Sequence, residues 1–508
     1  MKLTLPQQDI FFEQILFPDS PMYNIGAKVE IKGFIDFDAL NRAYIEVINQ
    51  NDAYRSVFSK NGENVEANFL TSHQCKLGFV DFSQFKNADE EANIYIEKIY
   101  TKSFNILSGD FLHYSALIKV KEDFYYLLTV CHHIITDGWG YSLLFQRFVN
   151  NYNEIVKHGM VKSDYPFSYK DFIQDDFDYQ NSHFFIKDLA YWTEKYKTLP
   201  PNLFSGEINE NRERKSLRKE LVIKRGLYNQ VIALANDFRC STFHIILGII
   251  YAYFGKKYLN TDLVIGVPVL NRNTGIFKKT AGLFAGVSPL RMSVNFEASF
   301  RSLIVDIKNQ IRKDYRHQRI PLRVINKELK LFGNRQGLFG ITLSYEKQDY
   351  SCDLINTKSK VIPLSHLSEQ VPLAIYIREY DDLEDVKIDF DYNLGFFDNS
   401  SISDVVNSFE ILLRDVIKHP DKSIDNLNYI TQQERNRLLV DFNDTGVDYP
   451  SDRTVVDLFE EQAGRTPDNV AVVFEEKSLT YRELDERSNR LAHYLRDRYG
   501  IGPDDLVG

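Results

Sequence analysis

The feature that most constrains the fold is a nearly unbroken apolar segment, residues 124–133, with the sequence FYYLLTVCHH. Apolar residues at consecutive positions predict a strand that is covered on both faces, as the central strands of α/β sheets are. Residues 112–120 precede it across the polar turn 121–123, which predicts a hairpin. After a five-residue loop, apolar side chains recur at helical spacing up to Gly159, which is suited to end a helix. They are Leu144, Phe148, Tyr152 and Ile155.

Helices and strands are predicted to alternate through the first 430 residues. The predicted helices are 37–48, 241–254, 300–316 and 402–419, and the further strands are 27–31, 263–269, 340–345 and 386–392. Two halves of this kind predict an α/β chain with two layered lobes. We place the first lobe at 1–175 and the second at 176–430, and we expect the polar stretch 175–213 to cross between them.

The character of the chain changes beyond residue 421. A polar, punctuated run predicts a linker at 431–452, and residues 453–508 begin another element set. There a short helix near Val455, the strand-like VAVVF and the capping-box signature Thr480–Glu483 follow one another. Because little chain follows them, we expect a truncated domain.

Charge and cysteine content narrow the function classes. The net charge is −10 and is spread along the chain, so we expect no nucleic-acid partner. The four cysteines, Cys75, Cys131, Cys240 and Cys352, are far apart, which disfavours disulfides and zinc and favours the cytoplasm. No segment has the uninterrupted apolar length of a membrane span, so we expect no membrane partner, no metal and no bound cofactor.

The sharpest chemical signal is HHIITDGW, residues 132–139. Adjacent side chains on a strand point to opposite faces, so only one of the two histidines can face a given cavity. A histidine at a strand end is well placed to act as a general base, since its ordinary pKa is about 6.5. Asp137-Gly138 suggests a tight turn with Gly138 free to take positive φ. Histidine pairs in strands are commonly packed and Asp-Gly is commonly only a turn, so the residues alone leave both interpretations open.

The segment resembles the HHxxxDG motif of the condensation-domain superfamily of nonribosomal peptide synthetases, relatives of chloramphenicol acetyltransferase. Further segments resemble that family's motifs in order over residues 1 to about 430. They are LPQQDIFFEQ, NDAYRSVF (with Asn51 in place of the usual His), Tyr169-Lys-Asp-Phe172, GLFAGVSPLR at 282–291 and HQRIPL at 317–322. LTYRELDERSNRLAHYLR, residues 479–496, is similar to the first core motif of adenylation domains, whose phosphate loop is absent from this sequence.

The resemblance implies two chloramphenicol acetyltransferase-like lobes that form a V-shaped pseudodimer with a central tunnel. It also implies acyltransferase activity that forms an amide between a donor thioester and an acceptor aminoacyl thioester. Both substrates would be carried on the 4'-phosphopantetheine of donor and acceptor carrier domains, beside an adjacent adenylation domain.

The resemblance also implies roles for individual residues. His133 would position or deprotonate the acceptor amine, while His132 would be structural. Gly138 would let the loop approach the substrate and would offer its N–H to the oxyanion. Asp137 would brace the loop through an ion pair with Arg272.

Some residues depart from the family pattern. Gly140 stands where Ser is usual, Ala285-Gly286-Val287 replace Val-Asn-Thr, and residues 334–337 only loosely match SRNPL. Three functions stay open: peptide formation, acylation of another acceptor, and a non-catalytic recruitment module. The acylating alternatives are a starter domain that adds a fatty acyl group, whose tunnel small residues at 140, 285 and 286 would widen, and an ester-forming relative. Since the opening motif begins by residue 3, we expect no carrier domain before it in this chain.

Overall fold

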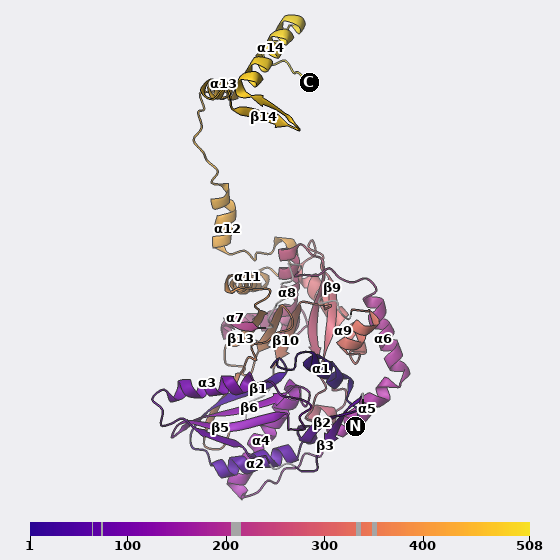
Figure 1. Cartoon of the computed structure of the whole chain (residues 1–508). Coiled ribbons are helices and arrows are strands. Elements are labelled where there is room, and N and C mark those ends of the chain that lie inside the picture. The colour runs from indigo at the N-terminus through magenta and orange to yellow at the C-terminus, as the bar shows by residue number, and fades with distance from the viewer. Residues whose placement is uncertain (63, 73–74, 205–214, 332–336, 348–352) are drawn as a thin grey trace. The chain divides into compact units, whose positions relative to one another are not determined.

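The structure is a computed structural model that describes residues 1–62, 64–72, 75–204, 215–331, 337–347 and 353–508. It divides into two compact units, residues 1–431 and 432–508 (Figure 1). Within the first unit lie the two mixed layers of sheet and helix that the sequence predicts. Of the residues 334–337, only Gly337 belongs to the described part of the chain.

The first sheet has the strand order β11-β1-β6-β5-β4. Its central strand is β6 (Phe124–His132), and this prediction is confirmed. The side chains of Leu127 and Cys131 enter one core with helices α2 and α4, whereas Leu128 and Val130 enter another with α3. Both faces of β6 are therefore covered, which explains its unbroken apolar sequence. The other elements are β1 (Asn24–Lys32), β4 (Gly78–Asp81), β5 (His113–Lys121), β11 (Lys358–Pro363), α2 (Phe37–Asn49), α3 (Ala88–Tyr100) and α4 (Gly138–His158).

The second sheet has the order β7-β13-β12-β10-β8-β9, in which β10 runs parallel to β12 and β8 and the other pairs are antiparallel. Helix α8 (Thr242–Tyr258) is apolar around its whole circumference and buried in this core, and it extends four residues past the predicted end. The remaining elements are β7 (Ser216–Ile223), β8 (Asp262–Val269), β9 (Gly286–Ser293), β10 (Ile341–Glu346), β12 (Leu373–Arg378), β13 (Val386–Asn393), α7 (Arg225–Asp237), α9 (Phe300–Asp314) and α11 (Asn399–Lys418).

The two lobes exchange segments. Strand β11 comes from the second half of the sequence but pairs antiparallel with β1 in the first sheet. Between β8 and β9 the chain also enters the first lobe, where Phe277, Leu283 and Phe284 join its core. The boundary that we predicted at residue 175 therefore does not separate two independent cores.

The polar stretch 175–213 differs from the expected simple crossing. Its first part is helical, as α5 (Tyr169–Gln180) and α6 (His183–Lys195), and residues 205–214 lie outside the described part. Trp192 buries the inner side of α6 and donates through its indole N–H to the carbonyl of His317. The smaller elements of this unit are α1 (Leu5–Leu16), β2 (Ser56–Asn61), β3 (Asn64–Phe69), α10 (Leu322–Glu328) and the 3₁₀ turns η1 (Asp52–Arg55), η2 (Phe277–Lys279), η3 (Tyr315–His317) and η4 (Ile424–Asn426).

The second unit is a hairpin between helices. The predicted capping box is present at its last helix, where Thr480 and Glu483 each bond the other's backbone N–H. The elements are α12 (Gln432–Leu439), η5 (Asp441–Asn443), α13 (Val455–Arg465), β14 (Val470–Phe474), β15 (Lys477–Thr480) and α14 (Tyr481–Tyr499).

Among the described residues, no single helix is long and apolar enough to cross a bilayer. The bent pair α7 and α8 passes that test only when the two helices are taken together.

Candidate active site

The HHIITDGW segment lies where β6 ends and α4 begins. His132 is the last residue of β6, and Gly138 is the first residue of α4. The two histidines diverge as strand geometry requires: His132 is fully buried, while His133 is half-buried and lines a cavity.

His132 is held in one tautomer by its neighbours. Its Nδ1 accepts a hydrogen bond from the Ile134 N–H (3.1 Å), so the ring proton sits on Nε2 and is donated to Oε1 of Gln14 (3.1 Å). Burial, and to a lesser extent the neighbouring His133, lowers the pKa of His132 to about 3. A neutral ring that is fully hydrogen-bonded and closed to solvent anchors α1 to the strand end.

His133 has a free imidazole and a fixed backbone. Its N–H donates to the carbonyl of Tyr23 (2.7 Å), and its carbonyl accepts from the Thr136 N–H (3.2 Å). Its buried Nδ1 has no partner of good geometry, although the residue's own carbonyl is near enough to raise the pKa slightly. Burial is the larger effect and lowers the pKa of His133, while the Asp137 carboxylate partly opposes it. The ring is therefore neutral near pH 7 and able to accept a proton.

The Asp137 carboxylate joins the histidine loop to the segment before β9. Oδ1 caps α4 through the Gly140 N–H (2.7 Å) and accepts from Arg272 Nη2 (2.8 Å). Oδ2 accepts from the N–H groups of Phe284 (2.9 Å) and Ala285 (3.0 Å). Burial alone would raise the pKa of Asp137, but the Arg272 guanidinium and these N–H groups outweigh it, so the pKa lies below its ordinary value.

Arg272 completes a buried ion pair across the two lobes. Its side chain is 1% exposed and that of Asp137 is 2% exposed. The remaining guanidinium hydrogen bonds go to backbone carbonyls, those of Phe277, Thr280 and Gly282. The pair therefore holds the 272–285 segment in place beside His133, which is a positioning role.

Gly138 differs from the expectation of a positive-φ turn. It has helical backbone as the first residue of α4, and it does not line the cavity beside His133. Asp137 is thus a helix N-cap rather than part of a tight turn, because the helix begins one residue earlier than a turn would allow. The Gly138 N–H has no acceptor within its own helix.

Gly140 does not widen a tunnel. A Cβ at this position would lie 2.6 Å from Thr136 Oγ1 and 2.8 Å from the Gly282 backbone nitrogen, so the space is already filled. Gly282, at φ +155°, in turn packs its Cα face against the Tyr169 ring, and the Tyr169 hydroxyl donates to the Leu283 carbonyl (2.5 Å). The YKDF motif therefore holds this segment from below, which is a close approach that only glycines permit.

The cavity beside His133 has a volume of about 520 Å³ and walls from both lobes. Ala285 and Gly286 line it, and a Cβ on Gly286 would meet nothing closer than 3.6 Å. No motif or spacing signals the acidic and basic side chains of its wall, because only the packing of α1, α10 and the β11–β12 connection around one space brings them together. Sequence reasoning missed all of them: Asp9, Glu13 and Arg323 on helices, and Glu369 between β11 and β12.

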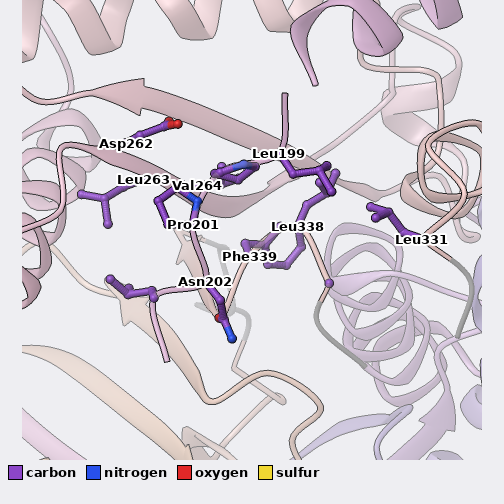
Figure 2. A pocket seen from close by; sticks show the side chains of 13 residues that line it. Leu199, Pro201, Asn202, Asp262, Leu263, Val264, Leu331, Leu338 and Phe339 are labelled. Carbon is purple, nitrogen blue, oxygen red and sulfur yellow. The ribbon is translucent and has the colours of Figure 1, made fainter. Parts of the chain in front are cut away.

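A second pocket lies against β8, between the 199–203 segment and residues 337–340 (Figure 2). Its volume is about 70 Å³, which is enough for only a few water molecules. Its only charged lining residue among those described, Asp262, pairs with Arg291 at 2.6 Å. Across the described part of the chain, no cluster of three or more His, Cys, Asp or Glu side chains could hold a metal ion.

Comparisons with known proteins agree with this geometry. The condensation-domain family model matches residues 1–439, and the AMP-binding-enzyme model matches residues 459–508. A protein of the linear gramicidin synthase of Brevibacillus parabrevis is 27% identical over 100% of this chain, and surfactin synthase subunit 1 of Bacillus subtilis is 25% identical over 99%. The chain spans only 7% and 14% of the length of these two relatives.

Solved structures share the fold. The starter condensation domain of rhizomide synthetase RzmA, in a mutant complex with C8-CoA and Leu-SNAC, matches with a TM-score of 0.76 and 21% identity, over 85% of this chain and 97% of that one. The first condensation domain of the calcium-dependent antibiotic synthetase matches with a TM-score of 0.74 and 18% identity, over 85% and 99%. The α/β fold of two acetyltransferase-like lobes is thereby confirmed.

Proposed function

Because this chain belongs to the condensation-domain family over residues 1–439, we propose that it forms amide bonds between two thioester-bound substrates within a nonribosomal peptide synthetase. One observation carries the proposal. The neutral imidazole of His133 faces a cavity whose walls come from both lobes, so two tethered substrates can meet beside one base.

The reaction balances with this chain's own groups. The acceptor nitrogen attacks the carbonyl carbon of the donor thioester, and His133 accepts the proton that the nitrogen loses. The tetrahedral intermediate collapses, the C–S bond breaks, and the proton passes to the departing thiolate. Asp137 and Arg272 hold the loops on either side of the base and touch neither substrate.

The partners follow from the relatives, whose names are those of peptide synthetases. Donor and acceptor carrier domains would deliver the substrates on 4'-phosphopantetheine, and residues 453–508 would begin the adjacent adenylation domain, after a linker at 431–452. Free thiols at Cys75, Cys131 and Cys240 favour the cytoplasm as its compartment.

Replacing His133 tests the proposal. In a condensation assay with a carrier-bound aminoacyl donor and an aminoacyl acceptor, His133→Ala is expected to lower the rate by at least about 10²-fold. His132→Gln, which changes the buried neighbour, is the matched variant and is expected to act mainly on thermal stability. A folded His133→Ala protein with near-normal turnover would remove the catalytic assignment.

A second candidate is a starter domain that transfers a fatty acyl group to the amine. The observation that favours it is the room beside Ala285 and Gly286, where small side chains leave the cavity wall open. Octanoyl and aminoacyl donors offered on the same carrier separate the two functions. We expect the aminoacyl donor to be used, and exclusive use of octanoyl would establish the starter function instead.

A further inference from the structure

The cavity beside His133 contains more carboxyl groups than the reaction requires. Asp9 and Glu13 line it from α1, and Glu369 lines it from the β11–β12 connection. Since one base already serves the single reacting amine, carboxyl groups on separate elements face other parts of a bound substrate. Glu13 is occupied within the protein, because its Oε2 accepts from the Tyr23 hydroxyl at 2.7 Å.

Glu369 differs from Glu13 in burial and pairing. The residue is 8% exposed, and its Oε1 accepts only a long hydrogen bond of 3.3 Å from Tyr376. Within the described ranges, the one basic side chain within 4 Å of its carboxyl is His366, at 3.7 Å. Burial lowers the pKa of His366 to about 4, so this ring carries no charge near neutral pH.

The cation nearest to this cluster is already committed. Arg218 binds both oxygens of Asp391 at 2.7 Å and lies 3.2 Å from Asp389. Burial, and then the Asp391 carboxylate, raises the pKa of Glu369. A nearly buried carboxyl at a cavity wall without a counter-charge is costly unless something in the cavity supplies one.

Asp9 shows the same incomplete pairing on another wall. Its nearest basic atom is Arg323 Nε at 3.7 Å, and its Oδ1 accepts no hydrogen bond of good geometry from the described residues. Arg323 is shared, since its Nη2 donates to Gln8 Oε1 at 2.8 Å. The cavity therefore has a deficit of positive charge on two walls, while much of its remaining lining is apolar, including Ile10, Met22 and Val371.

We propose that this cavity selects a substrate with a basic side chain, whose ammonium or guanidinium group pairs with Glu369. The inference rests on the proposed condensation function and names the class of amino acid that the site takes. An apolar wall around a charged end fits the long methylene stem and cationic head of such a side chain. The same chemistry suits an aminoacyl group on either substrate, the acceptor or the donor.

A matched pair of substrates tests the proposal. Lysyl and 2-aminoheptanoyl thioesters have side chains of equal length and differ in charge, and each is offered first as acceptor and then as donor. In one of the two arms kcat/KM is expected to favour lysyl by at least about tenfold, as a charge-assisted hydrogen bond in a desolvated site does. Glu369→Gln is expected to bring that ratio close to one, whereas Glu13→Gln leaves it unchanged.

Two results overturn the proposal: equal use of both thioesters in both arms, or a lysyl preference that persists in Glu369→Gln. A binding measurement separates this inference from the proposed function. If no arm gives product, condensation itself is refuted. Thermal stabilisation by the lysyl amide of pantetheine, greater than by the 2-aminoheptanoyl amide and lost in Glu369→Gln, then still supports the cation site. Equal stabilisation by the two amides removes it.

Discussion

Removing the Asp137 carboxylate is expected to destabilise the 1–431 unit by about 3–5 kcal/mol, because the Arg272 charge stays buried without its partner. Arg272 keeps its three carbonyl acceptors, which places the cost in the lower half of that range. The N–H groups of Phe284 and Ala285 lose their acceptor as well. Arg272→Ala is expected to cost a similar amount, since it leaves the carboxylate unpaired.

The double mutant isolates the pair. With both charges removed nothing buried is left uncompensated, so the combined loss is expected to fall short of the sum by about 1–3 kcal/mol. Asp137→Asn keeps an acceptor for the helix cap, so comparing it with Asp137→Ala separates the cap from the charge.

Tryptophan fluorescence during denaturant unfolding measures this effect on the correct unit. The chain has two tryptophans, Trp139 and Trp192, and both lie in the 1–431 unit, so the signal does not report residues 432–508. Losses that add strictly in the double mutant would refute the coupling on which the positioning role of Arg272 depends.

Three further predictions concern the cavity and the floor of the site. Gly140→Ser is expected to lower stability by about 1–3 kcal/mol and to slow condensation, because its Cβ meets Thr136 and Gly282 below 3.0 Å; unchanged melting and turnover would contradict the packing. Burial, partly offset by Arg323, raises the pKa of Asp9 to about 7, so the folded protein binds that proton more tightly than the unfolded chain does. Its contribution to stability is then fully present below about pH 4 and is lost as the pH rises towards 7, and Asp9→Asn should flatten this fall in thermal melts between pH 4 and 8. Glu369→Gln should likewise gain stability relative to the original chain as the pH rises, and an equal loss at every pH would show that the carboxyl is already compensated.

Local sequence patterns were enough to predict the elements that carry the histidine motif. The apolar run at 124–133 predicts β6 because burial on both faces is a property of the strand itself. The pairing of Asp137 with Arg272 was expected only through the family resemblance, and the structure contains that pair.

Other features depend on contacts between distant segments. The close approach of Gly140 to Gly282 and the pairing of β11 with β1 join residues that are far apart in the chain, so no local pattern predicts them. The helical start at Gly138 is a local error of a different kind, since an Asp-Gly pair is compatible with both a turn and an N-cap.

The pairing of β1 with β11 has a consequence for synthesis on the ribosome. One edge of β1 is covered only after translation has passed β11 at 358–363, although β1 itself ends at Lys32. At about 5–20 residues per second, that edge stays unpaired for tens of seconds in the nascent chain. An exposed strand edge recruits other strands. The first half of this protein is therefore a chaperone substrate until the second half emerges, and fragments cut at the lobe boundary aggregate unless both halves are made together.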